Sequence, residues 1–192
     1  MKLPFSIDLP PARADIATSR AIRRHATPIV ENAGKALTLM ADEKPLLAGA
    51  LLYWLYSRGA SPSPRQRADA DHLLACVAVS AAMPHLMKLF INRQRPDRKL
   101  THGLPRHGIP HSGDPEASFP SGHAMHLGAI AAALTRTTKA PVPAFAWLAA
   151  AGLSVTRLLL LAHYLSDVLG GLAIGAAIEP FIARFTKPRR VR

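Results

Sequence analysis

The sequence is poor in cysteine, in aromatic residues and in acidic side chains. Its 192 residues include one cysteine, Cys76, and only 6% aromatic residues. A single cysteine excludes an internal disulfide framework and any metal site made of cysteines alone. The 12 Asp and Glu face 24 Lys and Arg, a formal net charge of +12, which predicts a partner that carries phosphate: nucleic acid, anionic lipid or a phosphorylated substrate. Global disorder is excluded, because 49% of the residues are hydrophobic and can form a buried core.

Long apolar runs are present. Five stretches are almost free of charge: residues 45–57, 72–87, 117–135, 140–156 and 168–178, the last resuming after Glu179 as far as Ala183. A membrane-spanning helix needs about 20 mainly apolar residues, so only the third and fourth stretches qualify alone. The others qualify if flanking Lys, Arg or His side chains reach toward the head groups. Because the stretches offer no polar stripe for a solvent-facing side, we predict an all-α integral membrane helix bundle of about five spans. A soluble bundle with a buried core is the alternative.

Residues 1–44 differ from the rest of the chain. No run there is apolar enough for the core of a signal peptide, so we expect no cleavage. Apolar and polar side chains take opposite sides of one predicted helix: Ile29, Ala33, Leu37 and Met40 against Glu31, Asn32 and Lys35. This pattern predicts an amphipathic helix that lies on the membrane surface or caps the bundle, with an ordinary packed helix of a soluble domain as the alternative. A transmembrane domain over 45–186 and a basic tail over 187–192 would follow.

The longest connection runs from residue 92 to residue 119. Its 28 residues include four prolines, three glycines and three histidines, His102, His107 and His111. A loop of this length is usually functional or disordered. The histidines raise the alternative of a metal site, but the loop supplies no carboxylate at a matching spacing, so we expect no metal.

Two cations stand where the chain enters this loop. Lys88 and Arg95 are seven residues apart, so on one helix they would share a face to within about 20°. Pro96 disfavours helical geometry at the residue before it, which predicts that the helix ends near Arg95. The two cations would then point the same way at a helix end, unless they are only a basic flank at the membrane interface.

The chain leaves the loop through Pro120, Ser121, Gly122 and His123. Proline is favoured in the first turn of a helix, where unpaired backbone N–H groups form an anion site. Gly122 would let a ligand approach the backbone, and Ser121 adds a hydroxyl donor. His123 is a candidate acid beside such a site, although a lone histidine there is more often structural.

Arg157, His163 and Asp167 interrupt the last apolar region. A continuous helix over residues 140–183 would be about 66 Å long, about twice a bilayer core, so the chain must turn between 157 and 167. Because His163 and Asp167 are four residues apart, Asp167 is expected to accept a hydrogen bond from one ring nitrogen. The other nitrogen would then be a nucleophile or base. With the spans alternating in direction, all three motifs fall on one side of the membrane.

In order and spacing these motifs resemble the signatures K-x6-R-P, P-S-G-H and S-R-x5-H-x3-D of the type 2 phosphatidic acid phosphatase family, which shares its core with vanadium-dependent haloperoxidases. The resemblance covers residues 88–167, with Thr156 in place of the serine of the third signature. The substitution keeps the hydroxyl. Many membrane members resemble six-span bundles, whereas we expect a surface helix here in place of the first span.

The resemblance implies a lipid phosphate phosphatase that needs no metal or other cofactor. A set of five residues would hold the phosphoryl oxygens: Lys88, Arg95, Ser121, Gly122 and Arg157. His163 would attack phosphorus and form a phosphohistidine, and Asp167 would orient it. His123 would protonate the leaving oxygen and then activate water. Phosphoryl transfer demands mainly positioning and charge compensation, which these residues would supply.

Other functions remain open. A vanadate-dependent haloperoxidase would use the same residues, but such enzymes resemble larger soluble proteins. A membrane protein that only binds phospholipid head groups would need no oriented nucleophile. We expect no nucleic-acid partner, because the basic tail is short and carries no recognition motif. Gly171 and Gly175 have the spacing of closely packed helices, which would also suit a homo-oligomer.

Positive charge predicts the orientation in the membrane. The connections opposite the motifs are basic: Arg58, Arg65, Arg67, Arg136, Lys139 and the tail. Because short loops rich in Lys and Arg stay in the cytoplasm, we expect a multi-pass protein of the cytoplasmic membrane whose motifs face away from the cytoplasm. Arg20, Arg23 and Arg24 oppose this expectation, since a five-span chain leaves them on the motif side.

Overall fold

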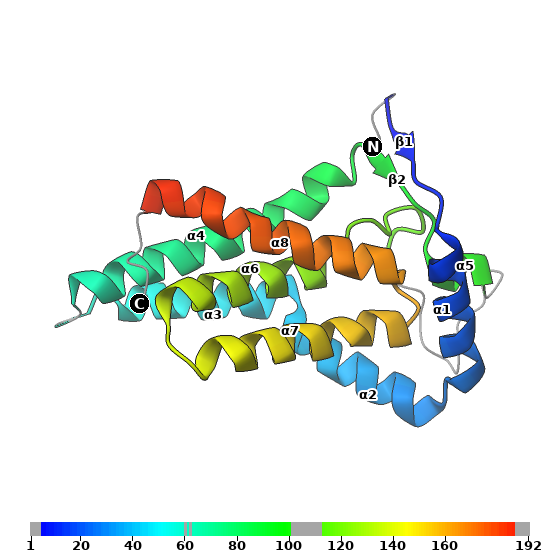
Figure 1. Cartoon of the computed structure of the whole chain (residues 1–192), viewed down its shortest axis with the longest axis horizontal. Coiled ribbons are helices and arrows are strands. Elements are labelled where there is room, and N and C mark those ends of the chain that lie inside the picture. Colours follow the sequence, from blue (N-terminus) through cyan, green and yellow to red (C-terminus); the bar gives the residue numbers. More distant parts are fainter. Residues whose placement is uncertain (1–4, 60, 62, 101–112, 187–192) are drawn as a thin grey trace.

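The chain folds into a bundle of helices, which confirms the all-α prediction (Figure 1). A computed structural model describes residues 5–59, 61, 63–100 and 113–186. The helices are α1 (Arg13–His25), α2 (Pro28–Thr38), the 3-10 turn η1 (Leu39–Ala41), α3 (Glu43–Tyr56), α4 (Pro64–Met87), α5 (Pro96–Leu100), α6 (Gly122–Thr137), α7 (Val142–Leu159) and α8 (Leu165–Thr186). Two short strands, β1 (Ile7–Asp8) and β2 (Ile91–Asn92), pair in parallel and tie the N-terminal segment to the loop after α4. His102, His107, His111 and the basic tail lie outside the described residues.

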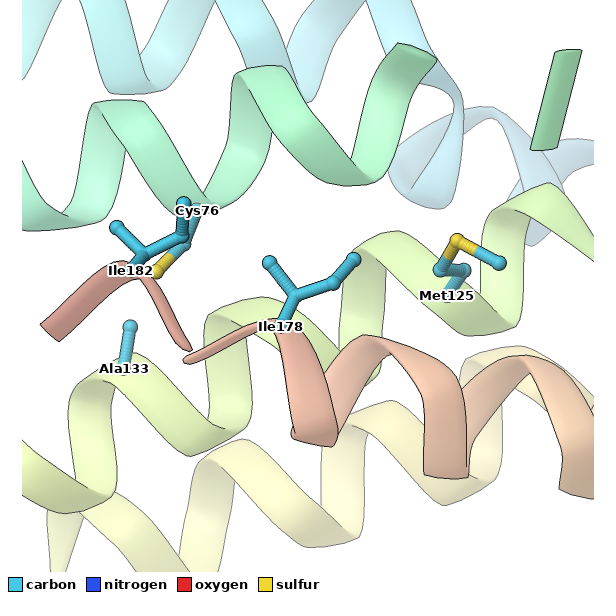
Figure 2. Packing of buried hydrophobic residues seen from close by; sticks show 5 residues of the cluster. All are labelled: Cys76, Met125, Ala133, Ile178 and Ile182. Atoms are coloured by element: carbon cyan, nitrogen blue, oxygen red, sulfur yellow. The ribbon is translucent and has the colours of Figure 1, made fainter. Parts of the chain in front are cut away.

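Helix α6 lies at the centre and packs against α4, α7 and α8. A methyl group at Gly175 would overlap the carbonyl oxygen of Met125, and one at Gly171 would overlap that of Ser121. The close approach of α6 and α8 therefore requires both glycines, and this pair packs within the chain. Figure 2 shows the apolar core where α4, α6 and α8 meet: Cys76, Met125, Ala133, Ile178 and Ile182.

Three helices of the described chain, α4, α7 and α8, are long and apolar enough to cross a membrane. Helix α7 confirms the predicted stretch 140–156. The stretch 117–135, also predicted to qualify alone, yields only the 16 residues of α6. Its first residues stay in the loop because the Ser118 and Ser121 amides bond to the carbonyls of Arg93 and Asp167, at 3.0 and 3.1 Å. The total of five spans stays a prediction.

Large apolar side chains remain on the outside of the bundle. Among the most exposed are Leu52 on α3 (66%), Phe145 and Leu148 on α7 (66% and 68%) and Phe185 on α8 (70%). A soluble protein seldom exposes so many large apolar side chains, whereas lipid tails cover them at no cost. This exposure disfavours the alternative of a soluble bundle.

The N-terminal region differs from its predicted form in two respects. It holds two helices, α1 and α2, instead of one. Helix α2 packs on α7, and its buried residues are Glu31, Gly34 and Thr38. Asn32 and Lys35 are exposed, as are Ile29 (81%) and, in η1, Met40 (62%). The prediction that Glu31 lies on an outward polar face was therefore wrong. In a membrane protein the exposed apolar side chains suit contact with lipid, and of the three predicted polar residues only Glu31 turns into the bundle.

Candidate active site

The three predicted motifs meet at one end of the bundle, where α4 and α7 end and α6 begins (Figure 1). A cavity of about 220 Å³ lies there, and six of the eight predicted site residues line it: Lys88, Arg95, Gly122, His123, Arg157 and His163. Ser121 and Asp167, the other two, are fully buried. The structure also places Asp42 and Glu43, at the start of α3, in the lining. Sequence analysis had not selected these two carboxylates.

Lys88 and Arg95 reach the cavity by a different route from the predicted one. The helix was expected to continue to Arg95, but α4 ends at Met87. The chain is then drawn into extended pairing, with the Arg93 and Arg95 amides bonded to the carbonyls of Glu116 and Pro115, each at 2.9 Å. Tertiary structure therefore brings the two cations together. The prediction that Lys88 and Arg95 lie near each other was correct, but the shared helical face given as its reason was wrong.

The Arg95 guanidinium is held by backbone carbonyls. Its Nε donates to the Asp114 oxygen at 2.8 Å, Nη1 to the Ala162 oxygen at 2.8 Å and Nη2 to the Ala117 oxygen at 3.0 Å. Nη1 also lies 3.3 Å from Nε2 of His163. These carbonyls fix the orientation of the buried guanidinium, which lies in the lining of the cavity.

The ring of His163 has a defined tautomer. Its Nδ1 lies 2.6 Å from the carbonyl oxygen of Ser118. Because a carbonyl can only accept, Nδ1 carries the proton, and Nε2 keeps its lone pair. Burial lowers the pKa of His163 well below its usual value, and the neighbouring Asp167 offsets this only in part. The ring is therefore neutral at pH 7, and its unprotonated Nε2 accepts a hydrogen bond from Nη1 of Arg95.

Asp167 does not accept the hydrogen bond that its spacing predicted. Its Oδ2 is 3.8 Å from Nδ1 of His163 and accepts instead from Oγ of Ser118 at 2.6 Å and from the Tyr164 amide at 2.8 Å. The prediction assumed that His163 and Asp167 share one helix, but α8 begins only at Leu165. Asp167 is thus linked to the histidine through Ser118, whose carbonyl oxygen accepts the hydrogen bond from Nδ1 of the ring.

A buried ion network behind the histidine was missed by sequence analysis. Arg93 donates from Nη1 to Asp167 Oδ1 and, at 2.8 Å, to Ser166 Oγ, and from Nη2 to Asp15 Oδ2 at 2.7 Å. Asp15, on α1, also accepts from the amide of Ser166 at 2.9 Å. Arg93 lies between the motif residues Lys88 and Arg95, and Asp15 is 78 residues away from it. No local spacing could have linked this pair.

Two donors near the cavity have no hydrogen-bond partner among the described residues: Oγ of Ser121 and Nε of Arg157, both buried. Arg157 uses Nη1 to hold Oγ1 of Thr38, at 3.0 Å. Buried donors without a partner are costly unless a ligand satisfies them. The first backbone N–H groups of α6, from Gly122 on, add further donors. The site is therefore built to receive an anion with several oxygens.

His123 and His126 both line the cavity but differ in their contacts. Nδ1 of His126 lies 3.2 Å from Oγ of Ser80, so this histidine has a structural partner. The hydrogen bonds found in the described chain include none to the ring of His123, which leaves it available to a ligand. The described residues contain no group of three or more His, Cys, Asp or Glu that could hold a metal ion.

The arrangement of the three motifs and a match to a family model both identify the family of this chain. The model of the PAP2 superfamily matches residues 70–190, which include all three motifs. The chain belongs to the PAP2 superfamily. With its three long apolar helices, this PAP2 protein is a membrane protein.

Two relatives of known name resemble this PAP2 chain. It is 33% identical over 161 residues to the lipid A 1-phosphatase of Rhizobium johnstonii, which covers 77% of this chain and 64% of the relative. It is also 33% identical over 124 residues to the decaprenylphosphoryl-5-phosphoribose phosphatase of Mycobacterium tuberculosis, covering 65% of each chain. The chain thus spans slightly less than two thirds of the length of these relatives.

Two solved structures share the fold. The crystal structure of Aquifex aeolicus LpxE superposes with a TM-score of 0.72 at 16% identity, covering 93% of this chain and 100% of that one. The first transmembrane PAP2-type phosphatidylglycerolphosphate phosphatase from Bacillus subtilis gives 0.64 at 21% identity, covering 93% and 88%.

Proposed function

We propose that this PAP2 protein is a membrane-embedded phosphatase that hydrolyses the phosphate monoester or diphosphate of a lipid through a phosphohistidine. The observation that carries the proposal is the unprotonated Nε2 of His163, 3.3 Å from Nη1 of Arg95, in a cavity that Lys88 and Arg157 also line. A neutral nucleophile among three cations suits attack on a phosphoryl group, whose negative oxygens the cations compensate. The names of the two relatives support a lipid phosphate as substrate.

The reaction would proceed in two displacements. Nε2 of His163 donates its lone pair to phosphorus while the bond from phosphorus to the leaving oxygen breaks, and His123 gives that oxygen a proton. His123, now neutral, takes a proton from water, whose oxygen attacks phosphorus as the P–N bond breaks. The Ser118 carbonyl holds the ring through Nδ1, and the nearby Asp167 carboxylate, which accepts from the Ser118 hydroxyl, would stabilise the positive charge of the ring in the intermediate. Lys88, Arg95, Ser121, Gly122 and Arg157 would hold the phosphoryl oxygens.

Phosphate release from a panel of lipids tests this function. Purified protein in detergent is expected to release inorganic phosphate from at least one of phosphatidate, phosphatidylglycerol phosphate, a prenyl diphosphate or a lipid-linked sugar phosphate. Activity should survive EDTA, because three cations take the role that a metal plays elsewhere. Orthovanadate should inhibit, since it adopts the five-coordinate geometry of phosphorus in the displacement.

The outcomes separate the competing functions. Binding of every lipid without release of phosphate would favour a non-catalytic head-group binder. Bromide oxidation by the vanadate-loaded protein with hydrogen peroxide, in the absence of any lipid turnover, would favour a haloperoxidase. Loss of activity in EDTA that one metal restores would contradict the metal-independent mechanism.

The pH profile should report Lys88. Burial lowers the pKa of Lys88 to about 8, and the nearby Arg95 and Arg157 push it in the same direction. As the pH rises through about 8 the ammonium loses its charge, so kcat/KM, which reports groups of the free enzyme, is expected to fall. Lys88→Arg keeps the charge to higher pH and should move this alkaline limb upward by one pH unit or more. An unchanged limb in Lys88→Arg would assign it to another group.

We also propose that the active site of this protein faces away from the cytoplasm. The basic connections of the far end support this orientation: Arg58, Arg65, Arg67, Arg136 and Lys139. Helix α1, with four further arginines, packs instead on α5 and α8 at the active-site end. The charge difference between the two sides is therefore smaller than the connections alone suggest.

Single cysteines can decide the orientation. In a Cys76→Ser background, Ala14→Cys on α1 and Ser61→Cys between α3 and α4 are both at exposed positions at opposite ends of the bundle. A membrane-impermeant thiol reagent on intact cells should label position 14 and spare position 61. The reverse pattern would show that the active site faces the cytoplasm.

A further inference from the structure

A second cavity, of about 500 Å³, lies between α1 and α5. Four cations and one apolar residue of the described chain line it: Arg20, Arg23, Arg24, Lys99 and Leu100. No described residue lines both this cavity and the catalytic one. Its volume is within the range of small-ligand sites. We call it the basic cleft.

The four cations of the basic cleft have no carboxylate partner in the described part of the chain. Arg23 donates to the carbonyl of Leu100, which joins the two sides of the cleft and leaves its charge uncompensated. The helix dipole accounts for Arg23 and Arg24, in the last turn of α1, but not for Lys99, which α5 supplies. Like charges that converge on a concave surface repel one another, and a bound anion relieves this cost.

The surroundings of the cleft indicate where such an anion would come from. The same half of α1 borders an apolar groove lined by Ala21, Ile22, His25, Ala26, Val30 and Leu159. A helix with cations on one side and an apolar groove on the other is typical of the membrane interface, where phosphate groups and acyl chains are both within reach. Helix α1 also packs on α5 at the active-site end of the bundle, and each end of a bundle that spans a membrane lies near a membrane surface.

We propose that Arg20, Arg23, Arg24 and Lys99 bind the phosphate of an anionic phospholipid head group, at a site separate from the catalytic cavity. The lipid would sit with its phosphate in the basic cleft and its chains toward the groove side of α1. This role goes beyond the proposed phosphatase function, because the bound lipid need not be turned over.

A double variant tests the site. Arg20→Gln/Arg24→Gln removes two of the four charges and keeps the Arg23–Leu100 bond. The matched control, Arg67→Gln/Arg184→Gln, removes the same charge from exposed residues outside the cleft and outside the catalytic site. Binding of fluorescent phosphatidylglycerol and of fluorescent phosphatidylcholine is measured by equilibrium titration in a neutral detergent. Phosphatidylglycerol is a phosphodiester, so it serves as a ligand that a phosphomonoesterase leaves intact.

The wild type and the control are expected to bind phosphatidylglycerol more tightly than phosphatidylcholine. The cleft variant should bind phosphatidylglycerol about tenfold more weakly, since each cation near a lipid phosphate adds severalfold to the affinity, with phosphatidylcholine unaffected. Unchanged binding in the cleft variant, or an equal loss in the control, would overturn the proposal. Displacement of the lipid by millimolar inorganic phosphate would assign the cleft to free phosphate instead. None of these readouts depends on turnover, so they stand apart from the test of the phosphatase function.

Discussion

Replacing His163 with alanine is expected to lower lipid-phosphate turnover by about 10⁴-fold or more, the scale seen when a covalent enzyme loses its nucleophile. The expectation rests on Nε2, which stays unprotonated because the ring proton is on Nδ1, bonded to the Ser118 carbonyl. Wild-type protein quenched during turnover of a ³²P-labelled lipid should carry an acid-labile phosphate on histidine. His163→Ala should carry none.

A matched variant controls for the loss of a histidine in general. His25 lies at the exposed end of α1, so His25→Ala should keep full turnover and the full amount of trapped phosphate. Turnover of the His163→Ala protein at the wild-type rate would exclude His163 as the nucleophile. Trapped phosphate that persists in His163→Ala but disappears in His123→Ala would exchange the roles of the two histidines.

The largest loss of stability is expected from Arg93→Met. Arg93 is 4% exposed and bonds to two carboxylates that are 2% and 0% exposed, Asp15 and Asp167. Removing the cation leaves both carboxylates buried without their partner, a change that typically costs about 3–5 kcal/mol. Thermal unfolding in detergent should show a midpoint lowered by several degrees. Turnover should fall with it, because Asp167 then loses one of the contacts that hold it against Ser118.

A second arginine–aspartate pair provides the control. Arg58 and Asp71 form an ion pair whose side chains are 31% and 45% exposed, so water screens it and Arg58→Met should cost about 1 kcal/mol or less. Asp15→Asn should have an intermediate effect, since Arg93 keeps Asp167. If Arg93→Met and Arg58→Met destabilise the protein equally, the buried network is not what joins α1 to the site.

This network connects the N-terminal helix to Asp167 of the candidate active site. The match to the PAP2 superfamily begins at residue 70, so α1 lies outside it. Asp15 nevertheless reaches Arg93 and Ser166 inside the site. The amphipathic pattern of residues 29–40 predicted a helix where α2 lies. The carboxylate that bonds to Arg93 is Asp15, on the preceding helix α1.

The sequence motifs predicted which residues belong to the site, but they did not predict how those residues are arranged. Lys88, Arg95, His123, Arg157 and His163 were all identified from their spacing and all line one cavity. The reasons given for two of the pairs were wrong. Both errors extended helical geometry past the end of a helix, at Met87 for α4 and before Leu165 for α8.

The sequence by itself determined that the protein is helical, that its longest helices suit a membrane and that residues of three motifs lie together. These properties depend on composition and on short-range spacing, which a sequence states directly. Only the tertiary structure decided which nitrogen of His163 is unprotonated, which residue lies between the ring and Asp167, and that Asp15 bonds to Arg93. Each of these depends on a hydrogen bond between residues far apart in the chain, such as the 45 positions between Ser118 and His163. Such contacts are chosen by the packing of whole helices, and no local pattern encodes them.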